Sequence, residues 1–183
     1  YHQEAFKKTC RAAEHEVKHI VLKTSRLELF CLTLPQLSLW VDDLASLERE
    51  LCCTYRAEPM EGFFLETANR RLERAQRDEL NALWHSFWLL LRKADRVVVG
   101  AASFKNLPNQ AGEVEIGYSL GKEFEHNGYM TEAVQALCDF ALRQNGVSRL
   151  LAETELDGLA SQRILQRCGF SEQRRGETIW WQR

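Results

Sequence analysis

The segment that most constrains how this chain folds runs from residue 113 to residue 146. It reads as a strand over 113–120, a loop that contains Gly128, and an amphipathic helical pattern over 132–145. The first-turn N–H groups of a helix lack partners within the helix, and the helix dipole makes that end positive. A glycine at this point lets another group approach the backbone closely. We therefore predict that residues 125–131 hold phosphate groups, as in a pyrophosphate-binding turn.

The composition is that of a soluble globular domain. The chain has 183 residues, enough for one domain with a core, and 45% of them are hydrophobic and 27% charged. A net charge of −2 gives no overall attraction to nucleic acid or to an anionic membrane. No apolar run approaches the roughly 20 residues of a membrane helix. We therefore expect neither nucleic acid nor a membrane as a partner.

The six cysteines show no metal-binding or redox pattern. They are Cys10, Cys31, Cys52, Cys53, Cys138 and Cys168, and they form neither a C-x-x-C pair nor a zinc spacing. Cys138 and Cys168 lie in apolar helical patterns that are typical of buried thiols. This usage favours a reducing, cytoplasmic location, and a redox or metal role is the less favoured alternative.

Periodicity predicts the elements of the first half. Residues 4–19 have helical spacing, so we expect a helical extension over 1–21 that packs on the domain or on a partner. A strand is predicted over 20–34, and a helix with one apolar stripe over 37–52. The helix predicted over 63–83 carries mixed charges, which favour a solvated, salt-bridged face over a nucleic-acid patch. In an enzyme this helix would also border the acceptor site.

The pattern of the second half of the sequence predicts a sheet. Runs over 85–91, 97–104 and 113–120 follow one another closely, so an antiparallel meander is the simplest arrangement. The strand over 149–155 follows a helix and should lie parallel to the strand over 113–120. A helix over 159–168 and a strand over 178–182 complete the chain.

Four motifs in order resemble those of a known family. They are Thr24-Ser-Arg26-Leu27, Glu115-Ile-Gly117-Tyr118, Gly128-Tyr-Met-Thr-Glu132-Ala, and Ala160-Ser161 followed by Gly169-Phe170. Over residues 22–183 the chain resembles the GCN5-related N-acetyltransferases (GNAT), in the branch that includes ribosomal-protein N-terminal acetyltransferases. The resemblance implies a single α/β domain, with a mixed, mostly antiparallel sheet that is splayed at its centre and flanked by helices.

The resemblance also implies acetyl-CoA as cosubstrate, with no metal. Its pyrophosphate would lie on residues 125–131 and its pantetheine along 117–120. The implied cofactor-binding residues are Ser119, Leu120, Glu125, His126, Asn127, Gly128, Tyr129, Met130, Thr131 and Ser161. For His126, simple exposure to solvent is the alternative.

Acetyl transfer to an amine needs a base for the amine proton and a donor for the leaving thiolate. Glu115 is the candidate base, with an ion-paired strand residue as an equally weighted alternative. Ser161 is the candidate acyl-CoA contact and proton donor, and local hydrogen bonds in a first helical turn are its alternative. Tyr118 is a second candidate donor, although a strand tyrosine is more often part of the core. The acceptor stays open among a protein N-terminus, a polyamine, an amino acid and an aminoglycoside, and the protein is expected to be a monomer or homodimer.

Three residues depart from the family pattern. Glu125 replaces a polar or basic residue, Met130 replaces a small residue, and Gly158 stands where asparagine is expected. Glu125 and Gly158 motivate an alternative, a catalytically silent acyl-CoA-binding regulatory domain of the same fold. A more distant alternative is an interaction module that docks through residues 1–20.

Overall fold

The computed structural model describes residues 19–183. The helix predicted over 4–19, and with it most of the extension over 1–21, lies outside the described residues. None of the helices in the described part of the chain is both long enough and apolar enough to cross a membrane.

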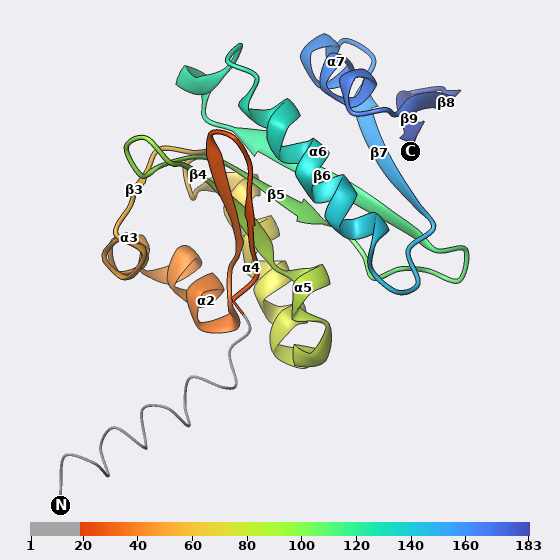
Figure 1. The fold of residues 1–183 in the computed structure, drawn as a ribbon. Coiled ribbons are helices and arrows are strands. Elements are labelled where there is room, and N and C mark those ends of the chain that lie inside the picture. Colours follow the sequence, from red (N-terminus) through yellow and green to blue (C-terminus); the bar gives the residue numbers. More distant parts are fainter. Residues whose placement is uncertain (1–18) are drawn as a thin grey trace, which may run out of the picture.

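One twisted sheet forms the centre of the domain (Figure 1). Its strands are β1 (Val21–Lys23), β2 (Leu27–Cys31), β3 (Thr54–Tyr55), β4 (Phe87–Arg92), β5 (Val97–Phe104), β6 (Glu113–Leu120), β7 (Arg149–Glu155), β8 (Ser171–Arg175) and β9 (Thr178–Gln182). Their order is β1-β2-β4-β5-β6-β7-β9-β8, and β3 pairs with the start of β5. Among the strand pairs of residues 19–183, only β3–β5 and β6–β7 are parallel. The expected mixed, mostly antiparallel sheet is therefore confirmed.

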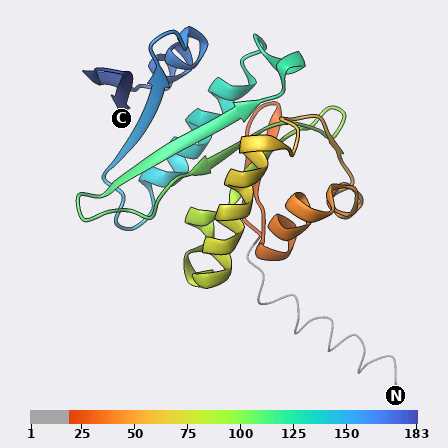
Figure 2. The same ribbon diagram turned by 180° about the vertical axis from the view of Figure 1, so that it is seen from behind.

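Helices cover both faces of this sheet (Figures 1 and 2). The helical elements are α2 (Leu34–Asp42), α3 (Leu44–Leu51), α4 (Gly62–Arg77), η1 (Glu79–Asn81), α5 (Ala82–His85), η2 (Lys122–Phe124), α6 (Tyr129–Leu142) and α7 (Leu159–Arg167). Trp88 and Leu90 of β4 pack with the α6 side, whereas Leu89 packs with the α2 and α4 side. Because β4 is buried on both faces, its sequence reads as a continuous apolar run.

The N-terminal elements are more divided than the sequence predicts. The strand expected over 20–34 is two antiparallel strands, β1 and β2, joined by a turn. The helix expected over 37–52 breaks at Asp43, where φ is −151° and the carboxylate caps α3 by accepting from the Ser46 backbone N–H at 3.3 Å. A capping side chain satisfies N–H groups that a helix start leaves unpaired.

The charged helix α4 also differs from expectation. No salt bridge in residues 19–183 involves Arg70, Arg71 or Arg74, so the predicted salt-bridged face is not found there. Thr67, Arg70, Arg71 and Arg74 follow the spacing i, i+3, i+4, i+7, which places them along one face of the helix. All four residues line an open cavity, in which Arg70 and Arg74 are exposed and Arg71 is buried.

The sheet splays between β6 and β7. Their ladder holds only three pairs, from Glu113↔Arg149 to Glu115↔Leu151, whereas β5 pairs with β6 as far as Leu120. Figure 2 shows the two strands side by side at one end and diverging toward the other. The expected opening at the centre of the sheet is confirmed.

The ladder also fixes which backbone groups point into this opening. Lys105 N–H donates to Glu115 O, and Gly121 N–H donates to Val99 O. Because antiparallel bonding alternates along a strand, the odd-numbered residues of β6 bond β5. The backbone groups of Ile116, Tyr118 and Leu120 therefore face the side from which β7 has separated.

Candidate active site

The loop before α6 has the geometry of an anion-binding turn. Gly128 is the N-cap of α6 with φ 77°, and no side chain caps the helix there. The N–H groups of the first turn are therefore available to a ligand, at the positive end of the helix dipole. α6 begins at Tyr129, three residues earlier than the sequence predicts, so this turn lies directly after Gly128.

The side chains of this loop differ in burial. Glu125, His126 and Asn127 are exposed, and Met130 is buried in the core. Asn127 Nδ2 donates to the Phe124 and Glu125 carbonyls, both at 3.0 Å, which stabilises the turn. Thr131 is half-buried. This loop therefore presents uncapped backbone N–H groups at the start of α6, directly after three exposed side chains.

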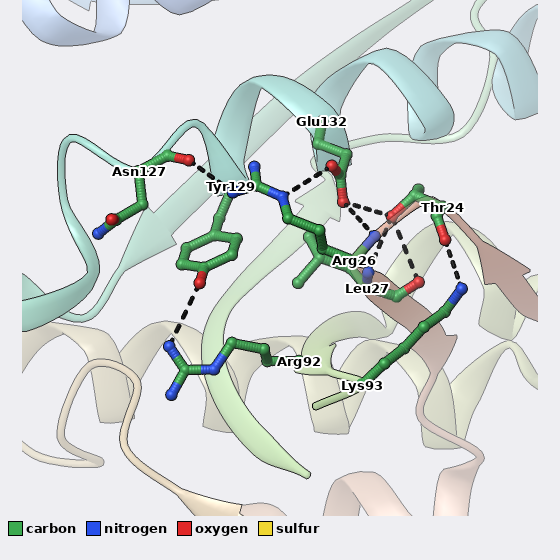
Figure 3. A network of polar contacts seen from close by, with 8 residues as sticks. All are labelled: Thr24, Arg26, Leu27, Arg92, Lys93, Asn127, Tyr129 and Glu132. Carbon is green, nitrogen blue, oxygen red and sulfur yellow. Dashed lines mark hydrogen bonds and ion pairs between the residues drawn. The ribbon is translucent and has the colours of Figure 1, made fainter. Parts of the chain in front are cut away.

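Tyr129 is held between two arginines. The Arg26 guanidinium lies 4.4 Å from the centre of its ring, and Arg92 Nη1 lies 3.3 Å from its hydroxyl (Figure 3). Cation–π contact and hydrogen bonding thus fix the first residue of α6.

A cluster of Thr24, Arg26 and Glu132, the Glu132 clamp, joins the β1–β2 turn to α6 (Figure 3). The Glu132 carboxylate accepts from Thr24 Oγ1 at 2.6 Å, from the Arg26 backbone N–H at 3.1 Å and from Arg26 Nε at 3.1 Å. Arg26 Nη1 donates to the Asn127 carbonyl at 2.8 Å. The clamp therefore links the anion-binding turn to the β1–β2 turn, which lies more than 100 residues earlier in the sequence.

The clamp carboxyl is held in its ionised form. Burial opposes its charge, but hydrogen bonds from Thr24 and Arg26 outweigh burial and keep the pKa of Glu132 below its usual range. Sequence reasoning identified the two motifs that contain these residues but missed their contact. The signal available in the sequence was that one motif carries a hydroxyl and a cationic residue, Thr24 and Arg26, and the other carries an acidic residue, Glu132.

Tyr118 and Ser161 meet where β6 and β7 separate. The Tyr118 hydroxyl lies 2.8 Å from Ser161 Oγ, although the two residues come from β6 and from the first turn of α7. Burial raises the pKa of Tyr118 to about 12, so its hydroxyl is protonated at neutral pH. The structure thus brings two of the three candidate catalytic residues together as a pair of possible proton donors.

Glu115 lies on the other face of β6. Val114 and Ile116 pack on the α6 side, so the Glu115 side chain points toward the α4 side, where its carboxylate pairs with Lys105 Nζ at 3.0 Å. Asn106 Oδ1 accepts from the Glu115 backbone N–H at 2.9 Å. The ion-pair partner that was left open for Glu115 is Lys105.

A cavity of about 880 Å³, the α4 cavity, opens on this face. It lies between α4, the loop around Pro59, and strands β5 and β6, and Gly117, Tyr118 and Ser119 form part of its wall. Ser119 Oγ is buried and has no hydrogen-bond partner in residues 19–183. A volume of this size is typical of small-molecule sites.

The described residues offer no group of three or more His, Cys, Asp or Glu side chains placed to hold a metal ion. Cys138 and Cys168 are buried free thiols, as expected. Burial raises the pKa of Cys168 to about 11, which keeps it as an unreactive thiol.

Comparisons with known proteins agree with this geometry. A sequence model of the acetyltransferase (GNAT) domain matches residues 38–171. An uncharacterised N-acetyltransferase of Bacillus subtilis, YjdG, is 37% identical over 83 residues, which are 45% of this chain and 49% of that protein. The probable N-acetyltransferase YjcK of the same organism is 29% identical over 101 residues, covering 55% of this chain and 54% of its own length. The chain thus spans about half the length of the curated relatives it matches.

Solved structures share the fold. The ribosomal-protein-S5-alanine acetyltransferase of Vibrio fischeri matches with a TM-score of 0.66 at 16% identity, over 90% of this chain and 96% of that one. A ribosomal L7/L12 α-N-protein acetyltransferase, RimL, in complex with coenzyme A, matches with a TM-score of 0.64 at 16% identity, over 90% of this chain and 97% of that one. Because the family match covers most of its residues, this chain belongs to the acetyltransferase (GNAT) domain family.

Proposed function

We propose that this domain transfers an acetyl group from acetyl-CoA to a primary amine. The observation that carries the proposal is the Tyr118–Ser161 hydroxyl pair, which lies where β6 loses its partner strand. The uncapped start of α6 follows β6 along the chain. A cosubstrate that is bound through phosphates at one end and reacts at its other end fits these two features.

The residues present fit such a cosubstrate. The N–H groups at the start of α6, around Gly128, would hold the pyrophosphate. The outward backbone groups of Tyr118 and Leu120 would pair with the pantetheine amides as a neighbouring strand does. The exposed Glu125 carboxylate is free to turn to solvent, so its charge does not block these N–H groups.

The reaction forms one C–N bond and breaks one C–S bond. The neutral amine attacks the thioester carbonyl carbon, and the sulfur leaves as a thiolate that takes a proton from the Tyr118–Ser161 pair. We assign the amine proton to Glu115, directly or through water, because this carboxylate faces the α4 side of β6. A backbone N–H of the splayed strand stabilises the oxyanion.

The first test is calorimetric titration with acetyl-CoA and with free CoA. Micromolar binding, about −8 kcal/mol, is the expected result. Release of free thiol is then followed over a panel of primary amines. Binding without thiol release on any amine would favour the catalytically silent domain, and no binding of either ligand at millimolar concentration would exclude both functions.

Two finer points belong to the same proposal. The free thiols favour a cytoplasmic location, and the expected assembly is a monomer or homodimer. Light scattering on the purified protein tests the assembly, and a larger oligomer would refute this expectation.

A further inference from the structure

The α4 cavity is lined by more cationic than anionic side chains. Arg70, Arg71 and Arg74 from α4 and Lys105 after β5 contribute positive charge, against Glu58 and Glu61 of the loop before α4. Lys105 is already paired with Glu115, so the arginines carry the cationic charge of the cavity that has no salt-bridge partner among residues 19–183.

The two outer arginines are exposed at this cavity, one helical turn apart. Arg70 and Arg74 form no salt bridge with any residue in the described range 19–183. Arg70 donates a long hydrogen bond of 3.4 Å to Thr67 Oγ1 and stacks loosely on Phe63 at 5.8 Å. Two guanidinium groups at this spacing, each with free N–H donors, can bind one carboxylate or phosphate.

The inner arginine strengthens the case. Arg71 is only 7% exposed, and its Nη1 donates a hydrogen bond to the Phe104 carbonyl at 2.7 Å. Burial lowers the pKa of Arg71 to about 10; Arg74 adds to the effect and the Glu115 carboxylate opposes it, and the group still carries its charge at neutral pH. Buried charges in proteins are normally paired, and none of the described carboxylates lies within ion-pair distance of Arg71. An anion bound elsewhere in the same cavity would offset this buried charge.

We propose that the α4 cavity selects a small primary amine that also carries an anionic group, a carboxylate or a phosphate, bound by Arg70 and Arg74. This inference rests on the proposed acetyl transfer and narrows its acceptor. Polyamines and aminoglycosides are polycations, which these arginines repel. Glu58 and Glu61 line the cavity from the loop before α4, and neither forms a salt bridge within residues 19–183. Their carboxylates attract the ammonium end, so a molecule with both charges fits the cavity in one orientation.

The size of the cavity favours a small molecule over a protein segment. Its volume of about 880 Å³ must also hold the acetyl end of the cosubstrate, since Gly117, Tyr118 and Ser119 line it. What remains suits an amino acid or an aminoalkyl phosphate.

The test compares acceptors of different charge at saturating acetyl-CoA. The panel contains L-glutamate, O-phosphoethanolamine, ethanolamine, spermidine, and a peptide with an acidic N-terminal sequence. We expect the first or second compound to give the highest kcat/KM, and the comparison between these two distinguishes a carboxylate from a phosphate. Thiol release and mass spectrometry of the acetylated product give the readout.

Matched variants then assign the selectivity to α4. Arg74→Gln should raise the KM of the anionic amine about 10-fold, and Arg70→Gln with Arg74→Gln about 100-fold, since a hydrogen bond to a charged group contributes about 1.5–3 kcal/mol. The KM values for ethanolamine and for acetyl-CoA should not change. Arg77→Gln on the same helix is the control, because Arg77 does not line the cavity.

The outcomes separate the inference from the function on which it rests. Efficient transfer to spermidine or ethanolamine, or equal effects of Arg74→Gln on all amines, would overturn the inference and leave acetyl transfer standing. Acceptance of the peptide alone would overturn the choice of a small molecule. Absence of acetyl-CoA binding and of transfer would overturn both.

Discussion

Glu132→Gln tests whether the Glu132 clamp holds the anion-binding turn. The substitution keeps the size of the side chain but removes the charge and turns one acceptor into a donor. Three hydrogen bonds, from Thr24 Oγ1, Arg26 N–H and Arg26 Nε, end on the present carboxylate, whose side chain is 20% exposed. Hydrogen bonds to charged groups contribute about 1.5–3 kcal/mol each, and a glutamine can still satisfy some of them. We expect a net loss of about 2 kcal/mol in the free energy of unfolding.

Thermal unfolding followed by circular dichroism measures this loss. For a chain of this size the expected fall in Tm is about 4–8 °C. Acetyl-CoA affinity should also fall several-fold, because the clamp holds the Asn127 carbonyl through Arg26 and thereby positions Gly128. Gln135→Ala, on the same helix with an exposed hydrogen bond to Asp139, is the control and should change neither quantity.

Two results would refute this reasoning. A Tm change of Glu132→Gln no larger than that of Gln135→Ala would mean that the three hydrogen bonds add no net stability. A fall in Tm with unchanged acetyl-CoA affinity would mean that the clamp stabilises the fold but does not position the turn.

Three further predictions follow from the same geometry. The pKa of Glu132 is lowered in the folded state, so the carboxylate contributes to stability above about pH 4.5 and loses this contribution as the pH falls further. The Tm difference between the parent and Glu132→Gln should therefore shrink in acid. A Tm difference that stays constant would contradict this prediction. Gly121→Ala would place a Cβ 2.5 Å from the Arg56 carbonyl oxygen and should lower the free energy of unfolding, measured by urea titration, by about 1–3 kcal/mol. Gly176→Ala is the control and should be tolerated, because a Cβ there would have no atom within 4 Å. Removing both hydroxyls, with Tyr118→Phe and Ser161→Ala, should lower kcat about 100-fold, and an unchanged kcat would remove the pair from the mechanism.

Much of the central sheet was predictable because its signals are local. Strands β6 and β7 begin and end where the sequence predicts, since alternation and flanking glycines mark both of them. Their parallel pairing followed from the intervening helix alone. Gly128 marked the anion-binding turn for the same reason, because a positive φ at a helix start favours glycine.

The remaining features depend on contacts that local patterns do not encode. β8 was missed because all five of its residues are exposed and its place is set by pairing with β9. The break at Asp43 interrupts an apolar stripe that continues across both helices, so periodicity alone could not locate it. The arginines of α4 alternate with acidic residues in the sequence, which predicted salt bridges, and only the fold shows that they line a cavity.

The Glu132 clamp also bears on the unusual Glu125. If this turn held phosphate through side-chain charge, an acidic residue in it would be strongly unfavourable. The structure instead leaves Glu125 exposed and offers uncapped backbone N–H groups, while Arg26 lies against Gly128, with Nη2 3.4 Å from where a Cβ would be. Because Glu132 fixes Arg26 beside the turn, a positive group stays close to the site whichever way Glu125 points. The departure at Glu125 is therefore compatible with phosphate binding, and affinity should depend more on Arg26 and Glu132 than on residue 125.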